Sequence, residues 1–559
     1  MAVWKPLPIG IDNFKKLIQE NYFYVDKTLL IKELLDMKGE VNLFTRPRRF
    51  GKTLNMSMLQ NFFENSGQSP APLFQGLKIM DTGDKYLSHM GKYPVISICL
   101  KSLKQSTYKN AFYCLKEEIA REFKRHDQIL NLIEYPADRE KYLRFAQMQA
   151  NDEEYLTSLK FLSQCLYDSF KIPCIILIDE YDVPLENAWF SGFYKEMSNV
   201  IRSIFESVLK TNDSLSFAVV TGCLRISKES IFTGLNNLKI IAVTNDSYGE
   251  FWGFTQNEVE SLMDFYGLSK NMPLIRDWYD GYLFGDSHVY NPWSVINYID
   301  SGHKNPNTLP KPYWSNTSSN HIVRSLIEQS DFSVKQEIET LIQGASIIKP
   351  VHEDITYEDI YASKDHLWNF LFFTGYLTKV QEKQTDEDIY MEMKIPNREV
   401  RYIYKTSVLH WFEEQTGKKD LSALYESILC GDTQNIAHIL SENLMETISF
   451  YDYQENYYHG FLTGLLINMK NYIVQSNRES GAGRPDIVVK SPSIRGEGII
   501  FEIKVAKRYQ DLEQKCHEAL EQIREKNYAS ALLQEGYSRI IKYGIAFYRK
   551  ECMVCKENI

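Results

Sequence analysis

Short apolar runs alternate with longer amphipathic segments over the first 300 residues of the chain. Four of these runs lie near Val41, Val95, Ile176 and Val219 and are rich in β-branched residues. Unbroken apolar strands separated by helical patterns predict a parallel sheet with helices on both faces. We therefore expect residues 1–300 to form an α/β domain.

The pattern changes after a segment rich in Pro, Asn and Gly at 301–312, which is typical of a domain seam or an exposed loop. From 301 to 405 the periodicity is more helical. Two apolar runs, 376–380 and 390–395, flank a polar stretch and predict a hairpin. We expect a smaller helical or mixed module here.

The pattern of helical and strand-like segments over residues 406–559 predicts a second, separate α/β unit. A helical stretch at 406–469 comes first. Strand patterns then reappear at 486–489, 498–505 and 543–548, and a long charged helix is expected at 511–527, between the last two strands.

Composition narrows the class of protein. The 559 residues exceed what one small binding module needs, and 44% hydrophobic with 24% charged residues is typical of a folded globular protein. The net charge is -10, from 63 Lys and Arg against 73 Asp and Glu. Because this balance provides no global positive field, any contact with DNA or RNA must be local.

Cysteine use and hydropathy indicate a soluble, cytoplasmic protein without a membrane partner. The nine cysteines are scattered, and several lie in apolar runs, as reduced core thiols do. Residues 1–10 lack a secretory pattern, and apolar stretches such as 461–469 fall short of the roughly 20 residues that cross a bilayer. Cys552 and Cys555 form a lone C-x-x-C, which does not predict zinc.

The first chemical signal is a strand, a turn and a helix start at 41–63, with Gly51, Lys52 and Thr53 opening the helix. In a phosphate-binding loop, backbone N–H groups surround the phosphates, the lysine reaches the β- and γ-phosphates, and the Thr hydroxyl holds Mg²⁺. Arg46 stands where the usual pattern has its first glycine, so a basic turn with a chance GKT is the alternative. The candidate ATP-contacting residues here are Arg46, Pro47, Arg48, Arg49, Phe50, Gly51, Lys52 and Thr53.

A second apolar strand, 174–178, favours the nucleotide interpretation because it ends in Asp179 and Glu180. An Asp at this tip can serve the Mg²⁺ that accompanies ATP, and the following Glu can polarise the attacking water. A third strand ends at Thr221, which could sense the γ-phosphate, and Arg225 could neutralise transition-state charge. As isolated residues, Thr221 and Arg225 fit ordinary loop structure better than these roles.

The second chemical signal has the form PD-x-ExK, with Asp486 leading one strand and Glu502 and Lys504 on the next. Residues i and i+2 of a strand share a face, so Glu502 and Lys504 project together while Phe501 and Ile503 point into the core. The two carboxylates could hold Mg²⁺ or Mn²⁺, helped by the Ile503 carbonyl, while Lys504 orients water or stabilises phosphodiester charge. The alternative is a surface salt bridge on a hairpin.

Other residues near this motif are weaker candidates. Glu392 and Lys394 repeat the ExK spacing in a strand-like segment without a Pro-Asp partner strand. Glu455 lies on a predicted helix and could supply a further metal ligand, whereas His459 fits a packed or hydrogen-bonded role. Gln522 could face the site, although a polar helix surface explains it equally well.

Taken together, these motifs resemble the AAA-ATPase-like proteins of bacteria that carry a C-terminal PD-(D/E)xK nuclease-like domain. The matching segments run from residue 7 to about 550 and include YFYVDKT, RPRRFGKT, ILIDEYD, WYDGYLFG, YNPWS, FFTGYLT, IPNREV, GRPDIVV and FEIKV. The resemblance implies that Arg46 is the family's form of the loop. It also implies an AAA-like P-loop core at 1–300, a helical or winged-helix-like module at 301–405, and a restriction-endonuclease-like domain at 406–559.

Two functions are consistent with these motifs. The first is an ATPase whose nucleotide cycle licenses Mg²⁺-dependent cleavage of DNA or RNA, in defence against mobile DNA. The second is a nucleotide-controlled switch whose C-terminal domain binds nucleic acid or a protein partner without cutting it. The nucleic-acid type and the oligomeric state do not follow from the sequence.

Overall fold

A computed structural model describes residues 4–224, 231–232, 234–316, 332–352, 363–384, 389–406, 420–446, 455–467, 469–476 and 485–558. The chain divides into two compact units. The first comprises Met1–Thr317 and Ser346–Arg401, and the second comprises Ser318–Ala345 and Tyr402–Ile559. The three domains expected from the sequence remain a prediction.

The core of the first unit is a parallel five-stranded sheet with the strand order β2-β3-β4-β1-β5. The four strands predicted from apolar runs are confirmed, whereas the short edge strand β5 was not predicted. The strands are β1 (Val41–Thr45), β2 (Val95–Cys99), β3 (Cys174–Asp179), β4 (Leu215–Gly222) and β5 (Leu238–Ile241). Since β1 and β3 are buried along their whole lengths, their apolar runs are continuous rather than alternating.

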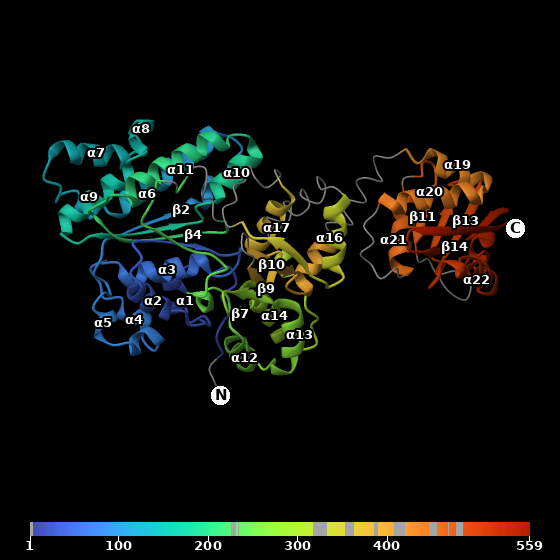
Figure 1. Ribbon diagram of the computed structural model, residues 1–559, viewed down its shortest axis with the longest axis horizontal. Helices are drawn as coiled ribbons and strands as arrows, with labels where there is room; N and C mark the ends of the chain where they lie inside the picture. Colours follow the sequence, from blue (N-terminus) through green and yellow to red (C-terminus); the bar gives the residue numbers. More distant parts are fainter. Residues whose placement is uncertain are drawn as a thin grey trace. The chain divides into compact units, whose positions relative to one another are not determined.

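Helices cover both faces of this sheet, as the α/β pattern predicted. Figure 1 shows α6, α9 and α11 on one side of β2 and β4 and α1 to α3 on the other. The helices up to β4 are α1 (Phe14–Gln19), α2 (Leu29–Met37), α3 (Lys52–Phe63), α4 (Ala71–Phe74), α5 (Asp84–Leu87), α6 (Tyr108–Arg125), α7 (Pro136–Ala146), α8 (Asp152–Tyr155), α9 (Ser158–Phe170), α10 (Val183–Ser191) and α11 (Tyr194–Leu209).

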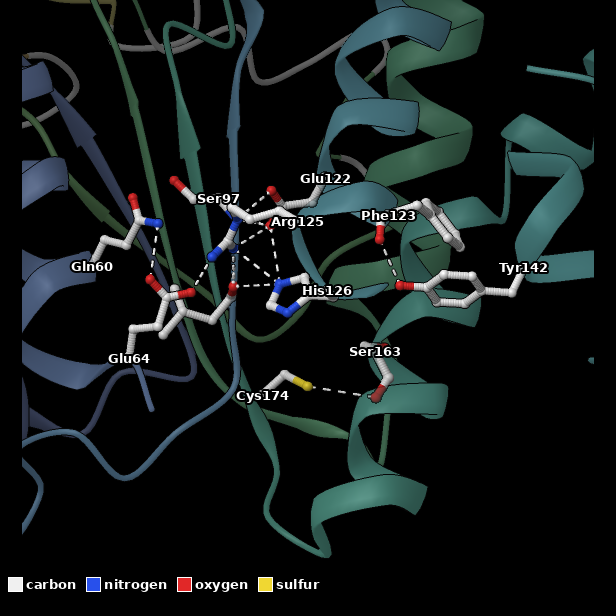
Figure 2. Close-up of polar contacts among 11 residues, drawn as sticks. Gln60, Glu64, Ser97, Glu122, Phe123, Arg125, His126, Tyr142, Ser163 and Cys174 are labelled. Atoms are coloured by element: carbon white, nitrogen blue, oxygen red, sulfur yellow. Dashed lines mark hydrogen bonds and ion pairs between the residues drawn. The ribbon is translucent and has the colours of Figure 1, made fainter. Parts of the chain in front are cut away.

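A buried ionic network joins α6 to the beginning of β2 (Figure 2). Glu122 accepts a 2.7 Å hydrogen bond from the Ser97 backbone N–H and a 2.8 Å bond from Arg125 Nε. Arg125 also pairs with Glu64, and His126 lies 3.0 Å from the Val95 carbonyl oxygen. Burial opposes ionisation of Glu122, but hydrogen bonds from Arg125 and His126 outweigh it and lower the pKa.

The first unit continues into a mixed module of helices and small antiparallel sheets. The predicted hairpin is confirmed, because β9 and β10 pair antiparallel and β8 adds a third strand. The elements are α12 (Gln256–Phe265), α13 (Met272–Tyr279), β6 (Tyr282–Phe284), β7 (Ser287–Val289), α14 (Pro292–Lys304), β8 (Ile347–Pro350), α17 (Lys364–Phe373), β9 (Thr378–Gln384) and β10 (Ile389–Lys394).

The second unit is built on a five-stranded mixed sheet with the order β11-β12-β13-β14-β15, in which only the β13–β14 pair is parallel. The parallel pair needs a crossover, which α22 provides at the place where the charged helix was predicted. The elements are α16 (Phe332–Ile342), α19 (Ser422–Cys430), α20 (Thr433–Glu446), α21 (Glu455–Leu466), β11 (Ile473–Ser476), β12 (Ile487–Lys490), β13 (Glu497–Val505), α22 (Leu512–Glu525), α23 (Ser530–Gln534), β14 (Arg539–Tyr548) and β15 (Glu551–Asn558).

Alternation along β13 divides its side chains between two layers. Phe501 and Ile503 belong to the core shared with α19, α20 and α21, as predicted, whereas Ile500 packs with residues of α22. Glu502 and Lys504 therefore project toward the α22 side of the sheet. Across the described part of the chain, none of the helices has the length and apolar content that a bilayer-spanning segment needs.

Candidate functional site

The turn between β1 and α3 has the backbone of an anion-binding loop. Arg49 and Gly51 both adopt positive φ, at 70° and 84°, and Gly51 is the N-cap of α3. Glycine reaches this conformation without steric cost, and the first N–H groups of α3 have no partner within the helix. The turn thus presents backbone N–H groups and the positive end of a helix dipole to an anion.

Three strands bring the predicted nucleotide residues together at one edge of the sheet. Thr53 donates a 2.7 Å hydrogen bond to Asp179 Oδ2, and Thr221 donates to the other oxygen, Oδ1. Lys52 Nζ lies 2.9 Å from the carbonyl oxygens of Arg46 and Pro47 and so braces the loop. This convergence arises because β1, β3 and β4 are adjacent and parallel, so their carboxyl ends meet.

Glu180 follows Asp179 in a strained conformation, with φ at 54°. Burial, and then the neighbouring Asp179 charge, raise the pKa of Glu180 above its ordinary value. A carboxylate so placed can accept a proton from water, which fits the role predicted for it. Arg225 lies outside the described residues.

The three loop arginines have different surroundings, which the sequence did not reveal. Arg46 is fully buried and donates 2.8 Å hydrogen bonds to the carbonyls of Thr45 and Ile241, and burial lowers its pKa to about 9. Arg48 forms an ion pair with Glu186 of α10. The Arg49 guanidinium lies 4.3 Å from the centre of the Trp293 ring in α14.

The loop also packs against the mixed module through apolar contacts. The Phe50 ring lies 4.9 Å from Tyr282 and 5.2 Å from Phe284. Gly375 approaches Pro47 so closely that an added Cβ would come within 2.8 Å of it. A side chain at residue 375 would therefore displace the loop.

In the second unit, Asp486 and Glu502 lie on neighbouring strands beside Lys504. Asp486 immediately precedes β12, and its Oδ2 accepts a 2.7 Å hydrogen bond from the Ile503 backbone N–H. Glu502 Oε1 accepts from Gln522 Nε2 and lies 3.5 Å from Lys504 Nζ. The sequence motif is therefore assembled in space.

The electrostatics of this pair favour a cation. Glu502 is 2% exposed, and its Oε2 is buried without a hydrogen-bond partner. Burial, and then the negative charge of Asp486, raise the pKa of Glu502 to about 7, and burial also raises that of Asp486. A divalent cation would supply the missing partner for Oε2 and offset the repulsion, so the residues present fit a metal of the Mg²⁺ class.

Among the described residues, Asp486 and Glu502 are the carboxylates that could hold a metal here. No group of three His, Cys, Asp or Glu side chains suited to a metal is found among those residues. Glu455 begins α21, but its side chain lies outside the described residues. His459 Nε2 lies 2.9 Å from the Asp486 carbonyl oxygen, in keeping with the hydrogen-bonded role expected for it. Another ExK copy, at Glu392, accepts hydrogen bonds from Ser346 and Gln381 in the hairpin sheet.

The sequence left one site residue undecided and did not indicate two others. Gln522, for which a place at the site and a polar helix surface were equally compatible, faces the site, and its Nε2 also lies 3.3 Å from the Tyr528 hydroxyl. Glu186 and Trp293, the partners of Arg48 and Arg49, were not singled out at all. Glu186 and Trp293 stand at no characteristic sequence spacing from Arg48 and Arg49. Their contacts become visible only in the folded chain.

Comparison with known proteins agrees with this geometry. Residues 8–232 match the family model described as "Predicted AAA-ATPase", and residues 453–557 match the "PD-(D/E)XK nuclease superfamily". The chain is also 26% identical over 559 residues to a protein of Azotobacter chroococcum mcd 1 named "Uncharacterized protein in vnfD 5'region". That alignment covers 98% of this chain and 97% of the relative. Residues 8–232 are thus similar to the predicted AAA-ATPase family, and residues 453–557 are similar to the PD-(D/E)XK nuclease superfamily.

Proposed function

We propose that this protein binds and hydrolyses ATP in its first unit and cleaves DNA or RNA with Mg²⁺ in its second. The observation that carries the proposal is the buried, unpartnered Oε2 of Glu502 beside Asp486. A buried carboxylate and a half-buried one, both with raised pKa values, are costly to keep side by side unless a cation is bound between them. Such perturbed groups gather at functional sites.

In the second unit, Asp486 and Glu502 would hold the metal, with Mn²⁺ as a substitute. When bound, the metal would supply Lewis-acid chemistry at a phosphodiester. Lys504, with its side chain 20% exposed next to Glu502, is placed to orient water or to stabilise negative charge on phosphate oxygens. Gln522 fixes the orientation of the Glu502 carboxylate, which leaves Oε2 available.

In the first unit, the α3 N-terminus and Lys52 would receive the phosphates of ATP. Thr53 and Asp179 share a hydrogen bond at the position where Mg²⁺·ATP needs oxygen ligands, and Glu180 is placed to accept the proton of the attacking water. Thr221 orients Asp179 from the neighbouring strand. We infer that nucleotide turnover licenses cleavage, in defence against mobile DNA.

The test is cleavage by the purified full-length chain. Plasmid, linear duplex, single-stranded DNA and RNA are incubated with ATP and Mg²⁺. Wild type should degrade at least one substrate, and Lys504→Ala should lower the rate about a hundredfold or more. Lys507→Ala is the matched control, because Lys507 lies three residues further along and is exposed.

A nucleotide-controlled switch without cleavage is the second candidate, favoured by the net charge of -10 and by the presence of only two described carboxylates at the site. Under this alternative, wild type and Lys504→Ala both leave every nucleic-acid substrate intact. Both also bind a nucleic-acid or protein partner in the presence of ATP and release it in its absence. Lys52→Ala should abolish nucleotide binding under either function, and full function of that variant would contradict both.

A further inference from the structure

The first turn of α14 contacts both the phosphate-binding loop and a buried carboxylate. Its N-cap, Asn291, is fully buried, and its Oδ1 accepts hydrogen bonds from the backbone N–H of Trp293 at 3.0 Å and of Ser294 at 3.4 Å. Pro292 occupies the first helical position, where its fixed φ is preorganised. The turn is therefore a rigid element that holds Trp293 and Ser294 in a fixed relation.

Trp293 faces the loop. Its ring carries the Arg49 guanidinium at 4.3 Å, and its indole Nε1 donates a 3.3 Å hydrogen bond to the Tyr313 carbonyl. Arg49 is exposed, and the charge of Glu180 also acts on it. One indole thus connects the loop that would bind phosphate with the segment at Tyr313.

Ser294 contacts a different group. Its hydroxyl lies 2.9 and 2.8 Å from the two oxygens of Glu399, a fully buried carboxylate. The Trp314 backbone N–H donates a further 2.8 Å bond to Glu399 Oε1. Glu399 therefore connects α14 to two segments, the one at Trp314 and the one that contains Glu399 itself.

These tied segments are the places where the chain leaves the first compact unit. The chain crosses into the second unit after Thr317 and again after Arg401. Trp314 and Glu399 lie a few residues before the two crossings and are bonded to each other. A displacement of α14 would consequently act on both exits at once, because both are hydrogen-bonded to its first turn.

Building on the proposed function, we propose that Trp293 and Ser294 couple the nucleotide state of the loop to the two connections that lead to the nuclease-like unit. Phosphate offers Arg49 charge-assisted hydrogen bonds, which are stronger than its contact with an aromatic face. ATP therefore competes with Trp293 for Arg49. When Arg49 leaves the Trp293 ring, the position of the indole changes. The change reaches Tyr313 through the indole hydrogen bond and Glu399 through the neighbouring Ser294.

The test uses the full-length chain and hydrogen exchange measured by mass spectrometry, with and without Mg²⁺ and a non-hydrolysable ATP analogue. Peptides covering 313–316 and 396–401 report on the two exits. In wild type, the analogue should change exchange in both peptides. Trp293→Leu should lose both responses while still binding a fluorescent ATP analogue, and Trp278→Leu, a half-buried tryptophan of neighbouring α13, should keep them.

Ser294→Ala gives a second, milder test, since it removes one hydroxyl and leaves Trp293 in place. It should weaken the response at 396–401, which the Trp314 N–H bond to Glu399 still reaches, and retain that at 313–316. Unchanged responses in Trp293→Leu or in Ser294→Ala would overturn the inference, as would nucleotide binding by wild type without any response. If wild type bound no nucleotide, the proposed function would fail as well, so the two failures are distinguishable.

Discussion

Replacing Glu502 by glutamine keeps the shape of the side chain and removes its charge. In the folded protein, burial and Asp486 raise the pKa of Glu502 from the ordinary 4.5 to about 7. Between these pH values the folded state holds a proton that the unfolded state has lost. Stability is therefore lost as pH rises through this window, and the full difference corresponds to about 3 kcal/mol.

Glutamine does not ionise, so Glu502→Gln loses no stability as pH rises through this window. We therefore expect the variant to be more stable than wild type without metal. Linkage gives an advantage of about 1.4 kcal/mol at pH 5.5 and about 3 kcal/mol at pH 8. Mg²⁺ at a thousand times its dissociation constant should reverse the order at pH 8. It would stabilise wild type by about 4.1 kcal/mol, which exceeds the advantage of the variant, and the variant hardly at all.

The assay is hydrogen exchange of β13 peptides in the full chain, at both pH values, with EDTA or Mg²⁺. Glu497→Gln is the matched control, because Glu497 lies in the same strand but is paired with Arg539 at 3.0 Å, away from the site. An advantage of Glu502→Gln that is equal at pH 5.5 and pH 8 would refute burial as the cause. A variant destabilised at pH 8 in EDTA would refute it too.

Three further predictions concern other contacts. Glu122→Gln should destabilise the first unit by about 1.5–3 kcal/mol in urea unfolding, since it removes the charge of a buried carboxylate that Arg125 and His126 bind. Exposed Glu117→Gln should stay within about 0.5 kcal/mol, and equal effects would contradict the network in Figure 2. Asp179→Asn should lower ATP hydrolysis about a hundredfold in a phosphate-release assay, and an unchanged rate would remove Asp179 from the site. Gln522→Leu removes a hydrogen-bond donor to the Glu502 carboxylate, so Mg²⁺ binding, measured by calorimetry as a function of pH, should shift to higher pH. An unchanged pH profile would show that Gln522 does not support the charged form of Glu502.

Local patterns in the sequence were enough for the elements that depend on them. The apolar runs near Val41, Val95, Ile176 and Val219 became β1 to β4, and the alternation around Glu502 placed Phe501 and Ile503 in the core. Strand periodicity and burial act over a few residues, so the sequence displays them directly. The edge strand β5 was missed because its four residues carry too short a pattern.

Partners far apart in the chain were not accessible in the same way. Arg48 meets Glu186, Arg49 meets Trp293, and Glu502 meets Gln522. In each pair the two residues belong to different segments of the chain. Their meeting depends on how helices pack on a sheet, which no spacing rule encodes.

The sequence by itself determined the chemistry available: a loop with Gly51 and Lys52, a carboxylate at the end of a strand, and an acid and a lysine on one face of another. Covalent order and side-chain periodicity are sufficient for that. Only the tertiary structure decided that Arg46 is buried, that Glu502 keeps an oxygen without a partner, and that Trp293 joins the loop to Tyr313. Burial and electrostatic environment are properties of the packed chain, because they depend on neighbours that folding brings from distant positions.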